Sequence, residues 1–230
     1  MGAFWDERAR ENPFYFVDNR IDYRSPDLER FWAQGEATVD AVLSPLGASL
    51  ESGDVVVEIG CGVGRLTRTL SERVQRVIAL DVSEEMIALA RVHNPELANV
   101  TWLVGDGSSL SGVQEGCADA CFSHVVFQHI PDPAVTLGYV TEMGRVLRRG
   151  GWAAFGVSND PSIRRRRSGV RARMTARLGR SPAGQGAPEW LGSAVELDAL
   201  RDAADQGGMA LENVVGEGSQ FCLVLARRRD

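Results

Sequence analysis

The segment VVVEIGCGVGRLTR, residues 55–68, limits the possible folds more than any other part of this 230-residue chain. Its first residues have the apolar, β-branched composition of a buried strand. The pattern GxGxG follows, and a helical pattern begins directly after it. A strand that leads through a glycine-rich turn into a helix is typical of ligand sites in open α/β sheets. The segment therefore predicts an α/β fold with a ligand site at this turn.

Apolar runs alternate with helical patterns along most of the chain. The runs predicted to form strands are residues 54–60, 74–81, 99–106, 118–126 and 151–158. The helices predicted between them cover residues 63–72, 83–93 and 133–148, the last of which ends at Gly150–Gly151. Because strands that alternate with helices usually form a parallel sheet, we expect such a sheet with helices on both faces.

The C-terminal part predicts one more helix and a hairpin. Residues 193–207 have a helical pattern, with Ser193 as the candidate N-cap and Gly207–Gly208 as the stop signal. The next residues, ALENVVGEGSQFCLVLAR, predict a β-hairpin that turns near Gly216–Gly218. Since 230 residues lie within the range of one domain, residues 1–230 are predicted to fold as a single unit.

Charge and cysteine usage argue against several classes of protein. The net charge of −6 gives no general affinity for nucleic acid. No apolar stretch approaches the ~20 residues of a membrane span, and the first residues lack the pattern of a secretion signal. The four cysteines show neither CxxC nor metal-ligand spacing. We therefore expect a cytoplasmic protein with reduced thiols, no metal site and no membrane partner.

Three carboxylates lie at or near the carboxyl ends of the first three predicted strands: Glu58, Asp81 and Asp106. In an open α/β sheet this edge forms the ligand crevice. The three negative charges would repel a pyrophosphate, and Arg65 replaces the third glycine of the dinucleotide fingerprint GxGxxG. A ligand with a positive charge, a ribose diol and an exocyclic amine fits better. S-adenosylmethionine (SAM) has all three.

Together these segments resemble the motifs of class I SAM-dependent methyltransferases, in the type 11-like group of small enzymes. The segments that carry the resemblance are VVVEIGCGVGRLT, VIALDVSEEMIALA, WLVGDGSSL, ADACFSHVVFQHIPDP and EMGRVLRRGGWAAFGV. The resemblance covers residues 50–160 well and 193–227 loosely. It implies a Rossmann-like, doubly wound sheet of seven strands, mostly parallel with an antiparallel last strand and with helices on both faces. It also implies an enzyme that transfers a methyl group from SAM.

The resemblance assigns the methionine part of SAM to the first motif. Gly60, Cys61 and Gly62 would pass their backbone along it, because a Cβ there would block close approach. Glu58 would orient the loop or accept a hydrogen bond from the ammonium group. Ser123, at the end of the fourth strand, would face the methionine part or the methyl group. We interpret Cys61 as a small residue in a crowded turn and not as a nucleophile.

The resemblance assigns the adenosine part of SAM to the second and third motifs. Asp81 would accept hydrogen bonds from the ribose hydroxyls, while Val82 and Met86 would pack on the adenine. Asp106 would accept from the adenine amine, and the neighbours of that contact would be Gly107 and Ser108. Structural alternatives stay open: an acid at a helix N-terminus for Asp81, helix core for Met86 and a turn residue for Asp106.

Two histidines follow the fourth predicted strand, beside the expected position of the methyl group. An oxygen or nitrogen acceptor can need a general base, and an unperturbed imidazole titrates near pH 6.5. His129 is the first candidate for this base and His124 the second, with Asp132 as the group that orients one of them. The alternative for His129 is a structural histidine that bonds the loop backbone, and many such enzymes need no base.

The resemblance divides the domain into four parts: an N-terminal cap (1–35), a SAM-binding core (50–158), an insertion (160–190) and a C-terminal helix and hairpin (193–227). The cap is rich in aromatic residues. Its candidate lid residues over SAM and the acceptor are Tyr23, Phe31 and Trp32. The alternative for these aromatic side chains is packing on the apolar face of the sheet.

The insertion is rich in arginine and is predicted to lie on the ligand-binding face. Its arginines are Arg164, Arg165, Arg166, Arg167, Arg171, Arg173, Arg177 and Arg180. This patch would bind an anionic acceptor or an acidic carrier protein, and the alternative is a solvated helix. No aromatic residues are interleaved with the arginines, which argues against RNA.

The leading functional prediction is methyl transfer from SAM to an oxygen or nitrogen atom of a small-molecule acceptor, for example a specialised metabolite. One alternative is a methyltransferase for tRNA or protein, which only the arginine patch supports. Another is a non-catalytic SAM-binding subunit. A dinucleotide oxidoreductase is disfavoured by Glu58 and Arg65.

Overall fold

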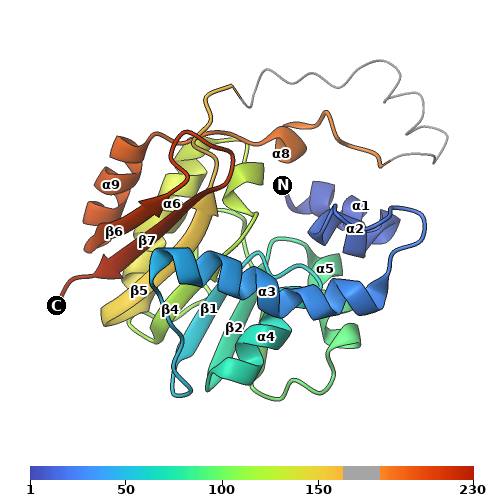
Figure 1. The fold of residues 1–230 in the computed structure, drawn as a ribbon, viewed down its shortest axis with the longest axis horizontal. Helices are drawn as coiled ribbons and strands as arrows, with labels where there is room; N and C mark the ends of the chain where they lie inside the picture. The colour runs from blue at the N-terminus through green and yellow to red at the C-terminus, as the bar shows by residue number, and fades with distance from the viewer. Residues whose placement is uncertain (163–181) are drawn as a thin grey trace.

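A single seven-stranded sheet forms the centre of the computed structural model, which describes residues 1–162 and 182–230 (Figure 1). The strands are β1 (Val55–Ile59), β2 (Arg76–Asp81), β3 (Val100–Val104), β4 (Ala118–Ser123), β5 (Leu147–Val157), β6 (Met209–Val215) and β7 (Cys222–Arg228). Their order is β3-β2-β1-β4-β5-β7-β6. Neighbours among β1 to β5 pair in parallel, while β7 is antiparallel to both β5 and β6. The predicted sheet, with its antiparallel last strand, is confirmed.

Helices cover both faces of the sheet. They are α1 (Gly2–Glu11), α2 (Pro13–Val17), α3 (Leu28–Leu46), α4 (Arg65–Arg73), α5 (Glu84–His93), the 3₁₀-helix η1 (Phe127–His129), α6 (Pro133–Val146), α8 (Pro188–Leu191) and α9 (Leu197–Gln206). Successive side chains of a strand point to opposite faces. Val56 therefore packs with α3 and α4, which lie in front of the sheet in Figure 1, while Val57 packs with α6 and α9. The two apolar faces of each inner strand explain why its sequence is almost continuously hydrophobic.

Side-chain caps fix the starts of the helices that position the site. Asp27, Ser83 and Asp132 accept hydrogen bonds from backbone N–H groups in the first turns of α3, α5 and α6. At the other end, α9 stops at Gly207 as predicted, and the β6–β7 hairpin turns through Gly216 and Gly218.

Two predicted boundaries were wrong. Ser193 does not cap α9, because its hydroxyl donates to the Ile130 carbonyl at 2.7 Å, and Glu196 is the N-cap. Gly150–Gly151 does not end a helix either. Strand β5 already begins at Leu147, and Gly150 takes a φ of 73° in the part of β5 where the pairing with β4 is irregular.

The N-terminal segment packs against α5. The Ser83 hydroxyl donates to Asp6 at 2.6 Å, and Arg10 forms an ion pair with Glu85 at 2.6 Å. The segment before α8 contacts α1, because the Ala183 N–H donates to the Glu11 carboxylate at 2.9 Å. Two segments that are far apart in the sequence therefore meet at α1. Within residues 1–162 and 182–230, no helix combines the length and hydropathy that a membrane crossing requires.

Candidate functional site

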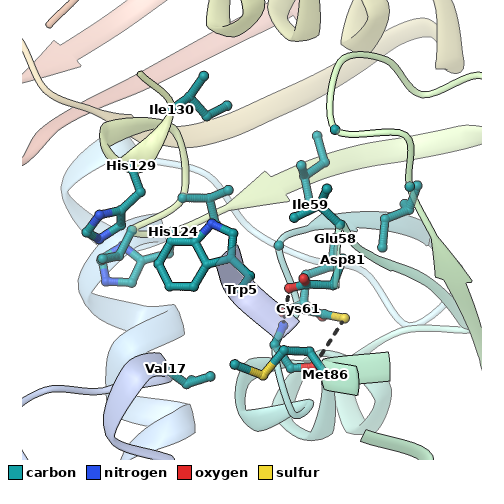
Figure 2. Close-up of a pocket in the computed structure, with 18 of the residues that line it drawn as sticks. Trp5, Val17, Glu58, Ile59, Cys61, Asp81, Met86, His124, His129 and Ile130 are labelled. Atoms are coloured by element: carbon teal, nitrogen blue, oxygen red, sulfur yellow. Dashed lines mark hydrogen bonds between the residues drawn. The ribbon is translucent and has the colours of Figure 1, made fainter. Parts of the chain in front are cut away.

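A pocket lies where the carboxyl ends of β1, β2 and β4 meet the N-terminal helices (Figure 2). The loops after β1, β3 and β4 contribute to its lining, and so do α1 and α2. Figure 2 shows His124 and His129 on one side and Glu58, Cys61 and Asp81 on the other. The pocket therefore has the position that the sequence predicts for a ligand crevice at this edge of the sheet.

The loop after β1 depends on glycine for its conformation and for space. Gly60 and Gly62 have φ angles of 77° and 54°, which side chains disfavour. A Cβ on Gly60 would lie 2.2 Å from a methyl of Val126, and one on Gly62 would lie 2.6 Å from a methyl of Val17. The N–H groups of Gly60 and Cys61 both donate to the Leu80 carbonyl, so the loop is tied to β2.

Asp81 is the last residue of β2, and its carboxylate forms hydrogen bonds with the glycine loop. One carboxylate oxygen accepts from the Gly62 N–H and the other from the Ser83 N–H, both at 2.9 Å. Burial raises the pKa of Asp81, while these backbone hydrogen bonds oppose the rise. Each carboxylate oxygen can accept more than one hydrogen bond, so Asp81 can still receive a hydroxyl group from the pocket.

Glu58 is a buried carboxyl in the same lining. The Thr67 hydroxyl donates to it at 2.6 Å. Burial raises the pKa of Glu58 to about 7, although the hydrogen bond from Thr67 lowers it. Because an adjacent cation would favour the ionised form, this carboxyl is suited to a positively charged group.

The His129 ring is held by the backbone of α8. Its Nδ1 lies 3.1 Å from the Trp190 carbonyl, which can only accept, so we assign the proton to Nδ1 and the lone pair to Nε2. Burial lowers the pKa of His129, which keeps the imidazole neutral at pH 7. The ring of Trp5 meets it edge-on with centroids 5.6 Å apart. His129 therefore makes a hydrogen bond to the backbone, as the structural interpretation of this residue expects. In this tautomer Nε2 carries a lone pair and can accept a proton.

His124 also lines the pocket but is held differently. Its Nδ1 is buried and has no hydrogen-bond partner among the described residues. Burial lowers the pKa of His124 to about 4, with a further contribution from the charge of Arg65. The next residue, Val125, has a φ of 57°, an unfavourable value for a β-branched side chain. Such strain is tolerated where the surrounding structure enforces it.

Several of the other predicted residues also line the pocket. Val82, Met86 and Gly107 contribute to it, beside Cys61. Burial raises the pKa of the Cys61 thiol, which agrees with a structural residue and not a nucleophile. The sequence analysis missed Arg65 as a lining residue and also Ser109, Leu110 and Tyr139. Of these, only Arg65 carried a signal, because it departs from the glycine fingerprint.

Asp106, Ser108 and Ser123 do not line the pocket. The Asp106 carboxylate accepts from the N–H groups of Ser108 and Ser109 and from both their hydroxyls. These hydrogen bonds, above all the one from the Ser109 hydroxyl, lower the pKa of Asp106 to about 2. Asp106 is thus the turn residue of the alternative interpretation. The Ser123 hydroxyl donates to the Ile59 carbonyl at 3.0 Å and ties β4 to β1.

The three predicted lid residues also lie elsewhere. The Tyr23 hydroxyl donates to Glu11, and Phe31 is 0% exposed within an apolar cluster. The guanidinium of Arg68 lies 3.7 Å from the ring centroid of Trp32. All three side chains find partners in the protein, so none is available to the pocket.

Other residues of the N-terminal segment face the pocket instead. They are Met1, Trp5, Phe16 and Val17. The aromatic-rich N-terminal segment therefore does line the pocket, but with side chains other than the three predicted ones. Asp132 was also assigned wrongly, because its carboxylate caps α6 through the Ala134 N–H and does not orient a histidine.

The arginine patch Arg164–Arg180 lies outside the described residues. In the part of the chain that the structure describes, no group of three or more His, Cys, Asp or Glu side chains has the arrangement of a metal site.

Comparison with known proteins gives the pocket a context. Residues 57–155 match a family model described as a methyltransferase domain. Over 112 residues the chain is 35% identical to the malonyl-[acyl-carrier protein] O-methyltransferase of Pectobacterium atrosepticum, covering 49% of this chain and 42% of that protein. It is 28% identical over 150 residues to a ubiquinone biosynthesis O-methyltransferase of Xanthomonas oryzae pv. oryzae, covering 64% and 53%. The chain thus spans about half the length of these curated relatives.

A solved structure has the same fold. The S-adenosylmethionine-dependent methyltransferase from Mesorhizobium loti aligns with a TM-score of 0.61 at 21% identity, covering 80% of this chain and 95% of that one.

Proposed function

This chain belongs to the class I SAM-dependent methyltransferase family, whose cofactor is SAM, and on that premise we propose that it methylates an oxygen or nitrogen atom of a small-molecule acceptor. One alternative is an acceptor carried on a macromolecule, such as a protein or tRNA. The other is a subunit that binds SAM without catalysis. The cofactor supplies an activated methyl group, so the protein must align the reactants and exclude water.

One observation carries the proposal: the glycine loop, the buried carboxyl of Glu58 and the half-buried carboxyl of Asp81 line one pocket. Glu58 fits the ammonium group of SAM, because a buried carboxyl with a pKa near 7 gains most from a cationic partner. Asp81 fits a ribose diol, because its oxygens retain lone pairs after accepting two backbone N–H groups. A phosphate would instead meet these two carboxyls at the loop.

The opposite side of the pocket fits the acceptor. His129 holds a lone pair at Nε2 at neutral pH, from which position it would take a proton from an acceptor hydroxyl or amine. Trp5 and Ile130 supply apolar surface beside it, which excludes water. Support for an oxygen acceptor comes from the two relatives, both named as O-methyltransferases. The malonyl-[acyl-carrier protein] relative gives the carrier-bound alternative a specific reason.

Calorimetric titration with SAM, S-adenosylhomocysteine and NADH tests the cofactor. We expect micromolar binding of both sulfur nucleosides and none of NADH. Mass spectrometry then detects methylation in a panel of phenols, amines and carboxylic acids, with an acyl-carrier protein as the macromolecular arm. Methylation of the carrier alone would favour the first alternative, and binding without any transfer would favour the second. Binding of NADH but not SAM would refute the proposal.

The His129→Asn variant tests the proposed base. With an acceptor identified in that panel, we expect kcat to fall by about 10²–10⁴-fold. Affinity for S-adenosylhomocysteine should change little, because His129 does not lie on the glycine-loop side (Figure 2). The wild-type kcat/KM should fall as the pH drops below about 6.5 through the lowered pKa of His129, since protonation removes the base. Full turnover in the variant would assign His129 a purely structural role.

A further inference from the structure

Asn94 is a buried amide that packs against the glycine loop, residues 60–64, from outside the pocket lining. It follows α5 directly and is only 2% exposed. Its Nδ2 donates to the Val63 carbonyl at 3.0 Å and to the Ala90 carbonyl at 2.6 Å. Asparagine side chains are mostly exposed, and a buried one needs hydrogen-bond partners. Because Val63 is the fourth residue of the glycine loop, Asn94 ties this loop to the end of α5.

Arg68 fixes the orientation of the Asn94 amide. The Nε of Arg68 donates to Oδ1 of Asn94, and a terminal nitrogen donates to the His93 carbonyl. The guanidinium also lies 3.7 Å from the ring centroid of Trp32, so it is held on two sides. Oδ1 faces a donor and Nδ2 faces two carbonyls, so only one orientation of the amide satisfies all these partners. The donor group of Asn94 is therefore directed at the loop.

The loop approaches Asn94 so closely that only glycine fits at the contact. Gly64 has a φ of 89°, and a Cβ on it would lie 2.7 Å from Nδ2 of Asn94 and 2.8 Å from a ring carbon of Trp102. Positive φ angles recur at every second residue of the loop, at Gly60, Gly62 and Gly64. Glycine loses more conformational freedom on ordering than any other residue. Hydrogen bonds from outside the loop therefore decide which conformation it keeps.

These outside hydrogen bonds come from two directions. Toward β2, the Leu80 carbonyl and the Asp81 carboxylate accept from N–H groups in the first half of the loop. Toward α5, Asn94 donates to a carbonyl in the second half. The two halves are thus held by different elements and by opposite kinds of partner. A loop that is already held in its bound conformation loses less conformational entropy when a ligand arrives, which raises the affinity.

Resting on the proposed function, we propose that Asn94 is a positioning residue for the cofactor. It holds the glycine loop in the conformation that receives SAM, and Arg68 directs its amide toward the loop. Neither side chain lines the pocket, so the effect falls on cofactor affinity and not on the methyl-transfer step.

The variants Asn94→Asp and Asn99→Asp form a matched pair that tests this role. Asn94→Asp keeps an oxygen for the guanidinium but replaces the donor to Val63 by an acceptor. Asn99→Asp makes the same chemical change at an amide that donates to two carbonyls at the end of α4, outside the pocket lining. Urea unfolding measures the stability of each variant. Calorimetry measures the affinity for S-adenosylhomocysteine and for 5′-methylthioadenosine, which lacks the amino-acid part.

We expect Asn94→Asp to weaken S-adenosylhomocysteine by at least about tenfold and 5′-methylthioadenosine by at least about threefold less, since the glycine loop is assigned to the methionine part. Asn99→Asp should bind both probes within about twofold of the wild type. With an acceptor from the panel, the KM for SAM in Asn94→Asp should rise in parallel with the loss of affinity, while kcat at saturating SAM stays within about twofold. A residue that only supports the fold would lower the free energy of unfolding without this split.

An affinity of Asn94→Asp for S-adenosylhomocysteine within twofold of the wild type would overturn the proposal. Equal weakening of both probes would also reject it, because that pattern reports a disturbed pocket. Arg68→Met is the second variant, for use also if Asn94→Asp does not fold. It removes the donor that orients the amide and should weaken S-adenosylhomocysteine by at least about threefold, and unchanged affinity there contradicts the role of Asn94. Failure of the wild type to bind S-adenosylhomocysteine would instead refute the proposed function.

Discussion

The two sides of the pocket are built in different ways. One side, the glycine-loop wall, consists of residues 58–62 and Asp81, and its carboxyls accept hydrogen bonds from their own surroundings. The other, the histidine wall, consists of Trp5, His124 and His129 and contains a buried nitrogen without a partner among the described residues. The hydrogen bonds of the first wall are made within the glycine loop and its neighbouring strands and helices. The second wall combines side chains from α1 and from the loop after β4, and the Trp190 carbonyl of α8 holds one of them. Under the proposed function, the first wall suits the cofactor and the second suits the acceptor.

The largest expected effect is at Gly60. Gly60→Ala places a Cβ 2.2 Å from Val126 at a φ of 77°, and the combined overlap and backbone strain should weaken S-adenosylhomocysteine by at least about 100-fold in calorimetry. Gly47→Ala is the matched control, because Gly47 has a φ of 72° with nothing within 4 Å of the added Cβ. That variant should lose only about 1 kcal/mol of stability and keep its affinity. Equal affinities in the two variants would show that the glycine-loop wall does not contact the cofactor.

A smaller effect is expected at Asp81. Asp81→Asn removes a charged acceptor and should weaken S-adenosylhomocysteine by about 10–100-fold, since hydrogen bonds to charged groups contribute about 1.5–3 kcal/mol. The control is Asp106→Asn, whose side chain serves a turn outside the pocket and should leave the affinity within about threefold. If Asp106→Asn proved the more damaging, the family assignment of the adenine amine to Asp106 would stand after all.

Glu58 gives a pH-dependent effect on stability. Its pKa is about 7 in the folded protein, above the ordinary value of 4.5, so its proton stabilises the folded state at low pH and this contribution disappears as the pH rises through 7. Urea unfolding measures the effect at pH 5 and pH 8. Between these values the free energy of unfolding of the wild type should fall by about 3 kcal/mol more than that of Glu58→Gln. The lowered pKa values of His124 and His129 act in the opposite direction, with stability lost as the pH falls below about 6.5. Both histidines are present in the wild type and in Glu58→Gln, so their contributions cancel in the comparison. If the free energy of unfolding changed with pH in the same way in both proteins, the raised pKa of Glu58 would be contradicted.

The smallest effect on binding is expected at Tyr23. Tyr23→Phe removes the hydrogen bond to Glu11, which should cost about 1 kcal/mol in unfolding experiments and leave S-adenosylhomocysteine affinity within twofold. Trp5→Leu, from the histidine wall, should by contrast reduce acceptor affinity. A large binding defect in Tyr23→Phe would restore the tyrosine to the lid.

The sheet could be predicted because its strands are short apolar runs separated by clear turn and helix signals. Burial on both faces imposes that composition on β1 and β2, so the local sequence carries the information. Ser193 was misassigned because a serine hydroxyl serves a distant carbonyl as readily as a helix N-terminus. That choice depends on tertiary packing, which no local pattern contains.

The same distinction applies to the pocket. Glu58 and Asp81 lie in the pocket lining because their positions follow from the ends of two strands. Asp106 lies outside that lining, where three serines nearby offer its carboxylate a complete local set of donors. The choice between Tyr23 and Trp5 depended on how the N-terminal helices are rotated against the sheet, and an aromatic-rich composition does not define that rotation.

Ser83 connects the end of β2 with helix α1, and a ligand in the pocket would contact both of these elements. Its N–H donates to Asp81, and its hydroxyl donates to Asp6 on α1. A ligand that contacts both Asp81 and Trp5 therefore stabilises the packing of α1 against α5. By thermodynamic linkage, the packing of α1 raises the affinity for the ligand by the same factor by which the ligand favours that packing. The stability of the packed α1 helix therefore contributes to the affinity of the pocket for its ligand.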